Sequence, residues 1–333
     1  MGTRVLALSF CLLLSLAVFA QQEAKPSPEP NPSSESAKAD ETSPASAPEN
    51  SPKPDLTPDA SGKLSQEQMQ QLFRVVAVKD MENDKLQRNY TYIERQVENK
   101  LDKKGQTKSS EVNTYEVLEI YGEQVERLIA KNDKPLSAKD AAKEEEKIQK
   151  IIDKRKNESE DDRRKREEKE EKQREDDRKF TKEVADAYDF KLVGTEEVNG
   201  REAWVIDGEP RPGFQPHMKE SKFLPKFHGR VWIDQGDLQL AKMNVECLDT
   251  ISWGVFLARF HKGSRFTLEQ TRVNDEVWLP RQLAVKVDVR LALLKNFNVD
   301  IEQSFRDYKK FRTSSKIVGV GELPDSKDVP DPK

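Results

Sequence analysis

The sequence is poor in the residues from which reactive sites are usually built. Its 333 residues include 3 histidines and 2 cysteines, and it has no GxSxG, HExxH, CxxC or glycine-rich phosphate-binding motif. His217, His228 and His261 are far apart, without the short spacing typical of metal ligands. We therefore expect a protein that is not an enzyme and that holds no metal or other cofactor.

The scarcity of cysteine also excludes an internal disulfide in the mature chain. Cys11 lies within the N-terminal apolar run, so Cys247 is the single thiol beyond that run. Met243, Val245 and Cys247 occupy alternate positions among polar residues. This pattern predicts that Cys247 is a small buried side chain rather than a reactive thiol.

Residues 1–20 have the pattern of an export signal. One basic residue, Arg4, precedes an apolar run that ends in small residues before Gln21. The run is shorter than the ~20 residues that a membrane-spanning helix needs, so we expect cleavage, with a retained anchor as the alternative. Cys11 follows the bulky Phe10 inside the run, which argues against a lipid-attachment cysteine. The pattern predicts a periplasmic or secreted protein.

Two stretches have too little apolar content to fold. Residues 21–62 contain half of the 18 prolines, interleaved with serine, alanine and glutamate, and Leu56 is their one large apolar side chain. We expect an extended, disordered linker here and a disordered tail at residues 321–333. A single domain, residues 63–320, lies between them.

Long period-two alternation is the main feature of the predicted domain. Between residues 229 and 308, apolar side chains recur at every second position, with charged or polar ones between them. Side chains alternate across a strand, so the pattern predicts an antiparallel sheet with one apolar and one solvated face. The apolar files are Leu283, Val285, Val287, Val289, Leu291 and Leu293, followed by Phe297, Val299, Ile301 and Phe305.

A helix that could cover the apolar face is predicted at the start of the domain, over residues 64–88. Ser65 and Gln68 have the spacing of a capping box. An apolar stripe with helical spacing follows: Met69, Leu72, Phe73 and Val76.

Further strands are predicted on either side of the middle of the chain. Residues 90–130 alternate and contain short turns, as in an antiparallel meander, and Asn199-Gly200 is a strong hairpin signal. Residues 210–226 contain four prolines together with large apolar side chains. This stretch is either a packed crossover or a flap over a cavity.

Residues 143–179 are almost entirely charged, with equal numbers of acidic and basic residues. Acids precede bases at helical spacing, as in Glu168 and Lys172, and each such pair stabilises a helix by roughly 0.2–0.5 kcal/mol. We expect one solvated helix, about 50–60 Å long at ~1.5 Å per residue, inserted as residues 137–187. Its neutral charge argues against nucleic-acid binding. The alternatives are a spacer, an arm that contacts an envelope protein, or a disordered segment.

Two short motifs resemble one known family. The order of helix, meander, crossover and final sheet, together with "v.GR.a.vi...P" and "g..WiD" motifs, is similar to the LolA/LolB/RseB-type superfamily of periplasmic lipoprotein-sorting carriers and sensors. The matching residues are Val198, Gly200, Arg201, Ala203, Val205, Ile206, Pro210, Gly229, Trp232, Ile233 and Asp234. The resemblance covers about residues 64–134 and 188–311. It implies an α+β fold, a curved antiparallel β half-barrel covered by an N-terminal helix, here with a long charged helical insertion.

Two functions remain open. The first is a non-catalytic carrier or sensor that binds an acyl lipid or lipoprotein in an apolar hollow. Its candidate lining residues are Phe256, Phe260, Phe266, Leu268, Val285, Val287, Val289 and Phe297. The second is an interaction scaffold of the cell envelope with a filled core, which contacts its partner through residues 143–179.

Overall fold

One thirteen-stranded antiparallel sheet forms most of the fold in a computed structural model. The structure describes residues 55, 57–60, 64–102, 104–121, 123–253, 258–291 and 295–311. The predicted export signal, most of the predicted linker and the predicted tail lie outside the described residues. The strands are β1 (Tyr90–Leu101), β2 (Thr107–Ile120), β3 (Glu123–Lys131), β4 (Lys134–Pro135), β5 (Tyr188–Val198), β6 (Arg201–Pro210), β7 (Phe227–Asp234), β8 (Leu240–Cys247), β9 (Ile251–Trp253), β10 (Ala258–Phe260), β11 (Arg265–Val273), β12 (Val277–Leu291) and β13 (Lys295–Lys310).

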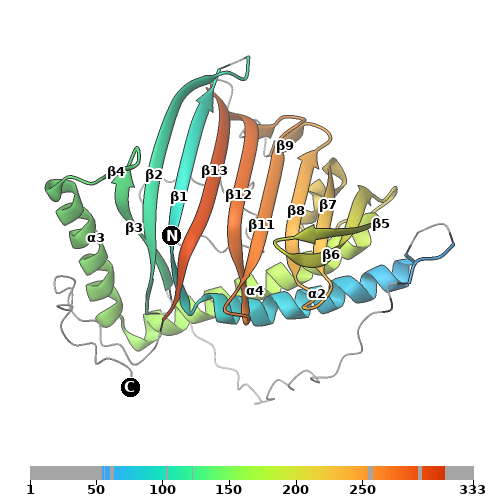
Figure 1. The fold of residues 1–333 in the computed structure, drawn as a ribbon, viewed down its shortest axis with the longest axis horizontal. Helices are drawn as coiled ribbons and strands as arrows, with labels where there is room; N and C mark the ends of the chain where they lie inside the picture. The colour runs from blue at the N-terminus through green and yellow to red at the C-terminus, as the bar shows by residue number, and fades with distance from the viewer. Residues whose placement is uncertain are drawn as a thin grey trace, which may run out of the picture.

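The sheet is open and curved, with helices along one end (Figure 1). Its strand order is β4-β3-β2-β1-β13-β12-β11-β8-β7-β6-β5, and β9 and β10 extend it beside β12. β1 and β13, the first and last of these strands in the chain, lie next to each other, with Tyr90 opposite Lys310. The path does not return on itself, so β4 and β5 stand at the two ends. This confirms the predicted α+β half-barrel with a charged helical insertion.

The helices are α2 (Gln66–Gln87), α3 (Ala138–Lys156), α4 (Glu160–Ala187) and the 3-10 helix η1 (Glu220–Lys226). α2 has the predicted capping box, since Ser65 and Gln68 satisfy each other's backbone N–H groups. Its side chains Met69 and Leu72 pack against Ile206 and Ile233 of β6 and β7. α2 therefore covers the end of the sheet that contains β5 to β8.

Asn83 joins α2 to β12, near the middle of the sheet. Its side-chain amide donates to the Trp278 carbonyl at 2.8 Å and accepts from the Trp278 N–H at 2.7 Å. These contacts satisfy both main-chain polar groups of a residue in β12. Asn83 is buried, so the two hydrogen bonds are shielded from water.

The charged insertion is two helices, and the prediction of one long solvated helix is wrong. α3 ends at Lys156, and α4 begins after Ser159, whose hydroxyl accepts from the Asp162 N–H. Basic residues fill the last turn of α3 and acidic residues the first turn of α4. Both placements complement the helix dipoles, so the sequence stops one helix and starts the next. In Figure 1, α3 stands beside β3 and α4 runs along α2.

α3 covers the outer edge of β3. The buried side chain of Ile148 packs against Ile120 and Val125. Glu144 accepts a hydrogen bond from the Leu128 N–H at 3.2 Å, and Lys147 donates to the Glu126 carbonyl at 3.3 Å. These side chains engage main-chain groups that an edge strand otherwise leaves open.

The proline-rich crossover is a packed connection. Leu224 of η1 is buried beside Ala187 and Tyr188 at the end of α4. The Tyr188 hydroxyl donates to the Leu224 carbonyl at 2.7 Å, and the His217 N–H donates to Glu183 at 3.0 Å. The alternative of a free flap does not fit these contacts.

Candidate ligand-binding face

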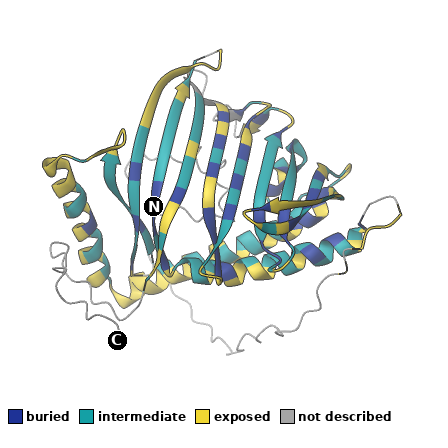
Figure 2. Ribbon diagram, viewed as in Figure 1, coloured by how far each residue is buried: buried dark blue, intermediate teal, exposed yellow. Residues whose placement is uncertain are grey.

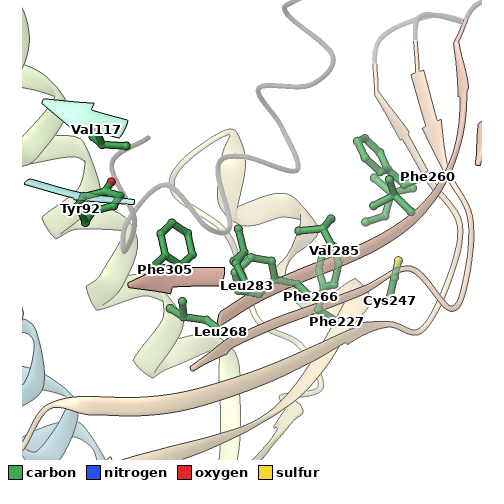
Figure 3. Close-up of a cluster of buried hydrophobic side chains, with 12 residues drawn as sticks. Tyr92, Val117, Phe227, Cys247, Phe260, Phe266, Leu268, Leu283, Val285 and Phe305 are labelled. Atoms are coloured by element: carbon green, nitrogen blue, oxygen red, sulfur yellow. The ribbon is translucent and has the colours of Figure 1, made fainter. Parts of the chain in front are cut away.

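The largest apolar cluster lies on one face of the central strands (Figure 3), and we call it the central apolar face. Its buried members are Tyr92, Val117, Phe227, Cys247, Ile251, Phe260, Phe266, Leu268, Leu283, Val285, Val287 and Phe305. Figure 2 shows the matching alternation, in which buried residues alternate with intermediate ones along β11 and mostly with exposed ones in the middle of β12. The alternation in the sequence therefore does mark one buried face.

Strand register brings these side chains together. Phe266 lies opposite Val285 across β11 and β12, and Leu268 lies opposite Leu283. Val285 in turn lies opposite Ile301 of β13. Directly paired residues of an antiparallel sheet project on the same side. A continuous apolar surface therefore extends from β8 to β13.

Five of the eight predicted lining residues belong to this face: Phe260, Phe266, Leu268, Val285 and Val287. Each is at most 6% exposed. Val289 and Phe297 are opposite each other on β12 and β13, but their side chains are not described. Phe256 lies outside the described residues. Whether these eight residues contact a ligand stays a prediction.

Sequence reasoning missed the part of the face that other strands supply. Tyr92 and Val117 come from β1 and β2, more than 100 residues before β11 to β13. The alternation of Tyr90 with Tyr92 signals a strand face, but local patterning cannot show that β1 pairs with β13. Cys247 was expected to be buried, and it is fully buried in this cluster.

The described α-helices contribute no side chain to the central apolar face. Its members, and the partly buried residues packed on it, come from strands, except Phe223, which comes from the 3-10 helix η1. The apolar stripe of α2 packs elsewhere, mainly against β5 to β8. Within the described residues, the apolar stripe of α2 thus covers a different part of the sheet from the central apolar face.

A buried carboxyl group interrupts the apolar character at β1. Glu94 is 2% exposed and lies opposite Phe305 of β13. Burial, together with the nearby charge of Glu126, raises the pKa of Glu94 to about 7, although a hydrogen bond from Gln303 opposes the shift. Burial also raises the pKa of the neighbouring Tyr92 and Tyr308 hydroxyls.

The described residues offer no alternative site for metal chemistry. No group of three or more histidine, cysteine, aspartate or glutamate side chains is arranged there to hold a metal ion. Within the same residues, no helix combines the length and apolar character that a membrane crossing requires. The candidate functional site is the central apolar face together with the buried carboxyl group of Glu94.

Comparisons with known proteins give structural likeness alone. A putative outer membrane lipoprotein-sorting protein domain from Vibrio parahaemolyticus is 11% identical, with a TM-score of 0.32 over 74% of this chain and 95% of that chain. A LolA superfamily protein from Nitrosomonas europaea is 7% identical, with a TM-score of 0.22 over 76% and 97%. A chain of the Pseudomonas aeruginosa MucA/MucB complex is 10% identical, with a TM-score of 0.20 over 74% and 99%.

No protein-family model matches the chain, and no curated protein does. Two of these solved structures, the lipoprotein-sorting protein domain and the LolA superfamily protein, carry the name of the group that the sequence motifs resemble. The TM-scores of the three structures are all below 0.5, so function has to be inferred from this chain's own residues.

Proposed function

We propose that this chain is an exported protein of the cell envelope that holds a lipid or a lipidated protein against the central apolar face. It acts as a carrier or sensor and performs no chemistry. One observation carries the proposal: the largest apolar cluster takes no side chain from the described α-helices. A sheet face of this kind suits acyl chains, which need apolar contact but little directional bonding.

Export is part of the proposal and rests on the sequence. Residues 1–20 have the basic start, apolar run and small-residue end of a secretion signal. A carrier of acyl chains is useful where lipids must cross an aqueous space. Fractionation of cells that express the full chain tests this: the protein should appear outside the cytoplasm with the leader removed.

Lipid extraction and mass spectrometry of the purified protein test ligand binding directly. The expected result is a recurrent acyl species at a fixed ratio to protein. Repeated preparations without lipid, in a protein that also binds no added fluorescent fatty-acyl probe, would contradict the proposal.

A matched pair of variants locates the ligand. Val285 and Lys286 are neighbours on β12 that project to opposite faces, one buried and one exposed. Val285→Trp should displace the acyl species because its indole occupies space on the central apolar face. Lys286→Trp adds the same side chain to the other face and should leave the lipid bound. Equal lipid content in the two folded variants would place the ligand elsewhere.

For the alternative function, an interaction scaffold, α4 is the part of the charged insertion that offers a long exposed surface to a partner. α3 is docked on β3, whereas α4 exposes charged residues along much of its length. If α4 binds an envelope protein, neutralising Lys165, Lys169 and Lys172 to glutamine should abolish in vivo crosslinking and leave the fold intact. Unchanged crosslinking would exclude this surface.

A further inference from the structure

Glu94 occupies an unusual position for a carboxyl group. It follows Tyr90 and Tyr92 at alternate positions of β1, and all three side chains are buried. Across the neighbouring strands it lies opposite Phe305 of β13 and Tyr115 of β2. Phe305 and Tyr92 belong to the central apolar face, and their rings meet edge to face at 5.8 Å. Glu94 therefore lies on β1 directly beside the side chains of that face.

One of its two oxygens has no partner. Glu94 Oε1 accepts from the Gln303 amide at 2.5 Å, whereas Oε2 is buried without a hydrogen bond within the described part of the chain. Gln303 also donates to Gln96, so its amide is already shared. A buried polar atom left without a partner is costly and uncommon. Oε2 thus keeps an unused hydrogen-bonding capacity beside an apolar surface.

The surroundings favour the neutral acid. The charged neighbour that acts on Glu94 is another carboxylate, Glu126 of β3, and none of the ion pairs within the described residues includes Glu94. The other titratable groups that face this region are the hydroxyls of Tyr92, Tyr115 and Tyr308, which are neutral at physiological pH. Burial and Glu126 raise the pKa of Glu94 to about 7. At and below neutral pH a large share of the side chain therefore carries a proton that it can donate.

We propose that Glu94 is the polar anchor of the central apolar face: its protonated carboxyl group donates from Oε2 to the ester or amide carbonyl of an acyl ligand. This inference rests on the proposed lipid-binding function. In such a ligand the carbonyl group is bonded to the end of the acyl chain. Glu94 is placed in the same way, next to the apolar side chains that would contact that chain. A cationic headgroup fits less well, because it would bury a second charge and require the ionised acid.

Two fluorescent probes of equal chain length separate this inference from the proposed function. One is a pyrene-labelled acyl ester, and the other is the matched pyrene-labelled alkane, which has no carbonyl. The full-length protein should bind both at pH 6, and the ester about 5-fold more tightly, as expected for one neutral hydrogen bond. Raising the pH to 8.5 deprotonates Glu94, so the advantage of the ester should disappear while alkane binding persists.

Substitutions at Glu94 complete the test. Glu94→Gln keeps a donor that does not titrate and should bind the ester about equally at both pH values. Glu94→Leu removes the donor and should lose the roughly 5-fold preference for the ester without weakening alkane binding. Glu126→Gln removes the like charge and should move the midpoint of the pH dependence downward. Glu98→Leu on the same strand, whose own ion-pair partner is Lys100, is the matched control and should change nothing.

The outcomes are distinguishable. If wild-type protein binds neither probe, the lipid-binding function and the anchor both fail. If it binds both probes with equal affinity at pH 6, or if Glu94→Gln retains the wild-type pH dependence, the anchor is wrong and the lipid-binding function stands. The pH dependence of Glu94→Gln tests the anchor even if Glu94→Leu does not fold.

Discussion

Arg201 and Asp234 form a two-pronged ion pair between β6 and β7, with Nε 2.7 Å from Oδ2 and Nη2 2.8 Å from Oδ1. Asp234 is buried, and its Oδ1 also accepts from the Asp237 N–H at 2.7 Å. The Arg201 guanidinium lies 5.6 Å from the centre of the Trp278 ring. The pair joins the two short motifs, Gly-Arg and Trp-Ile-Asp, on which the family resemblance rests. Arg201 and Asp234, the charged members of these motifs, therefore stabilise the sheet.

Loss of the arginine should destabilise the protein strongly. Arg201→Met leaves the buried Asp234 carboxylate without its counter-charge, and we expect a loss of about 2–4 kcal/mol in the free energy of unfolding. The control is Arg230→Met, which removes an equally two-pronged but more exposed pair with Asp207 on the same strands. It should cost at most about 1 kcal/mol. Urea denaturation of both variants measures the difference, and equal losses would contradict it.

Asn83 should tolerate truncation much less well than Gln87, the other α2 residue that hydrogen-bonds to the Trp278 main chain. Asn83→Ala removes both hydrogen bonds to the Trp278 main chain and leaves a buried N–H group unpaired. We expect a loss of about 2–4 kcal/mol in the free energy of unfolding, because two hydrogen bonds are lost and the buried Trp278 N–H is left without an acceptor. Gln87 also donates to the Trp278 carbonyl, so Gln87→Ala is a control that removes one of two donors to one acceptor. Thermal and urea denaturation should show that Asn83→Ala is much less stable than Gln87→Ala.

Removal of the side chains with which α3 holds the β3 edge should promote self-association. The double variant Glu144→Ala and Lys147→Ala frees the Leu128 N–H and the Glu126 carbonyl. An open edge strand can pair with a second copy. Light scattering with size-exclusion chromatography should detect larger species.

The matched control uses the same helix and the same residue types. Glu146→Ala with Lys150→Ala removes an ion pair on the solvent side of α3. It should stay the size of the wild-type protein. If both double variants behave alike, the edge contacts have no protective role.

Stability should fall as the pH rises from 5 to 8. Burial raises the pKa of Asp80 to about 7, with the charges of Asp84 and Asp177 adding to the shift, and Glu94 is also raised to about 7. Between the ordinary carboxyl range near ~4 and pH ~7, the folded state holds more protons than the unfolded chain, so increasing pH favours unfolding. Glu94 alone should contribute on the order of 2 kcal/mol, and the partly exposed Asp80 less.

Urea denaturation at pH 5, 6.5 and 8 checks this sign. Glu94→Gln and Asp80→Asn should each flatten the profile, whereas Glu82→Gln, at an exposed position on α2, should not. Groups such as Glu276, whose pKa is lowered by hydrogen bonds from Lys310 and Tyr90, change protonation below this window. A profile that rises from pH 5 to 8 would refute the prediction.

Local patterns in the sequence were enough to predict the strands, their buried face and the helix α2. Period-two alternation identified Phe266, Leu268 and Val285, and the spacing of Ser65 and Gln68 identified the helix start. Local rules succeed here because burial and capping depend on residues a few positions apart.

Properties that depend on distant neighbours could not be predicted in this way. Glu94 reads as one acid of a polar strand, and its burial follows from pairing with β13 and β2. The docking of α3 depends on contacts between Ile148 and β2 and β3. The break between α3 and α4 had a local signal, because basic residues before Asn157 and acids after Ser159 mark a stop and a start. This signal was missed because pairs of opposite charge at helical spacing continue on both sides of the break and favour a single helix.

The pairing of β1 with β13 affects the order in which the molecule can fold. The β1-β2-β3 hairpins need only neighbouring segments, whereas the other side of β1 must wait for a strand about two hundred residues later, with Tyr90 opposite Lys310. Contacts this distant carry a large loop-closure entropy and slow the final step. A chain that stops before Lys295 would be left with two separate sheets, each with a long unpaired strand at its break. Synthesis of the last strand is therefore the event that joins the two halves into one sheet.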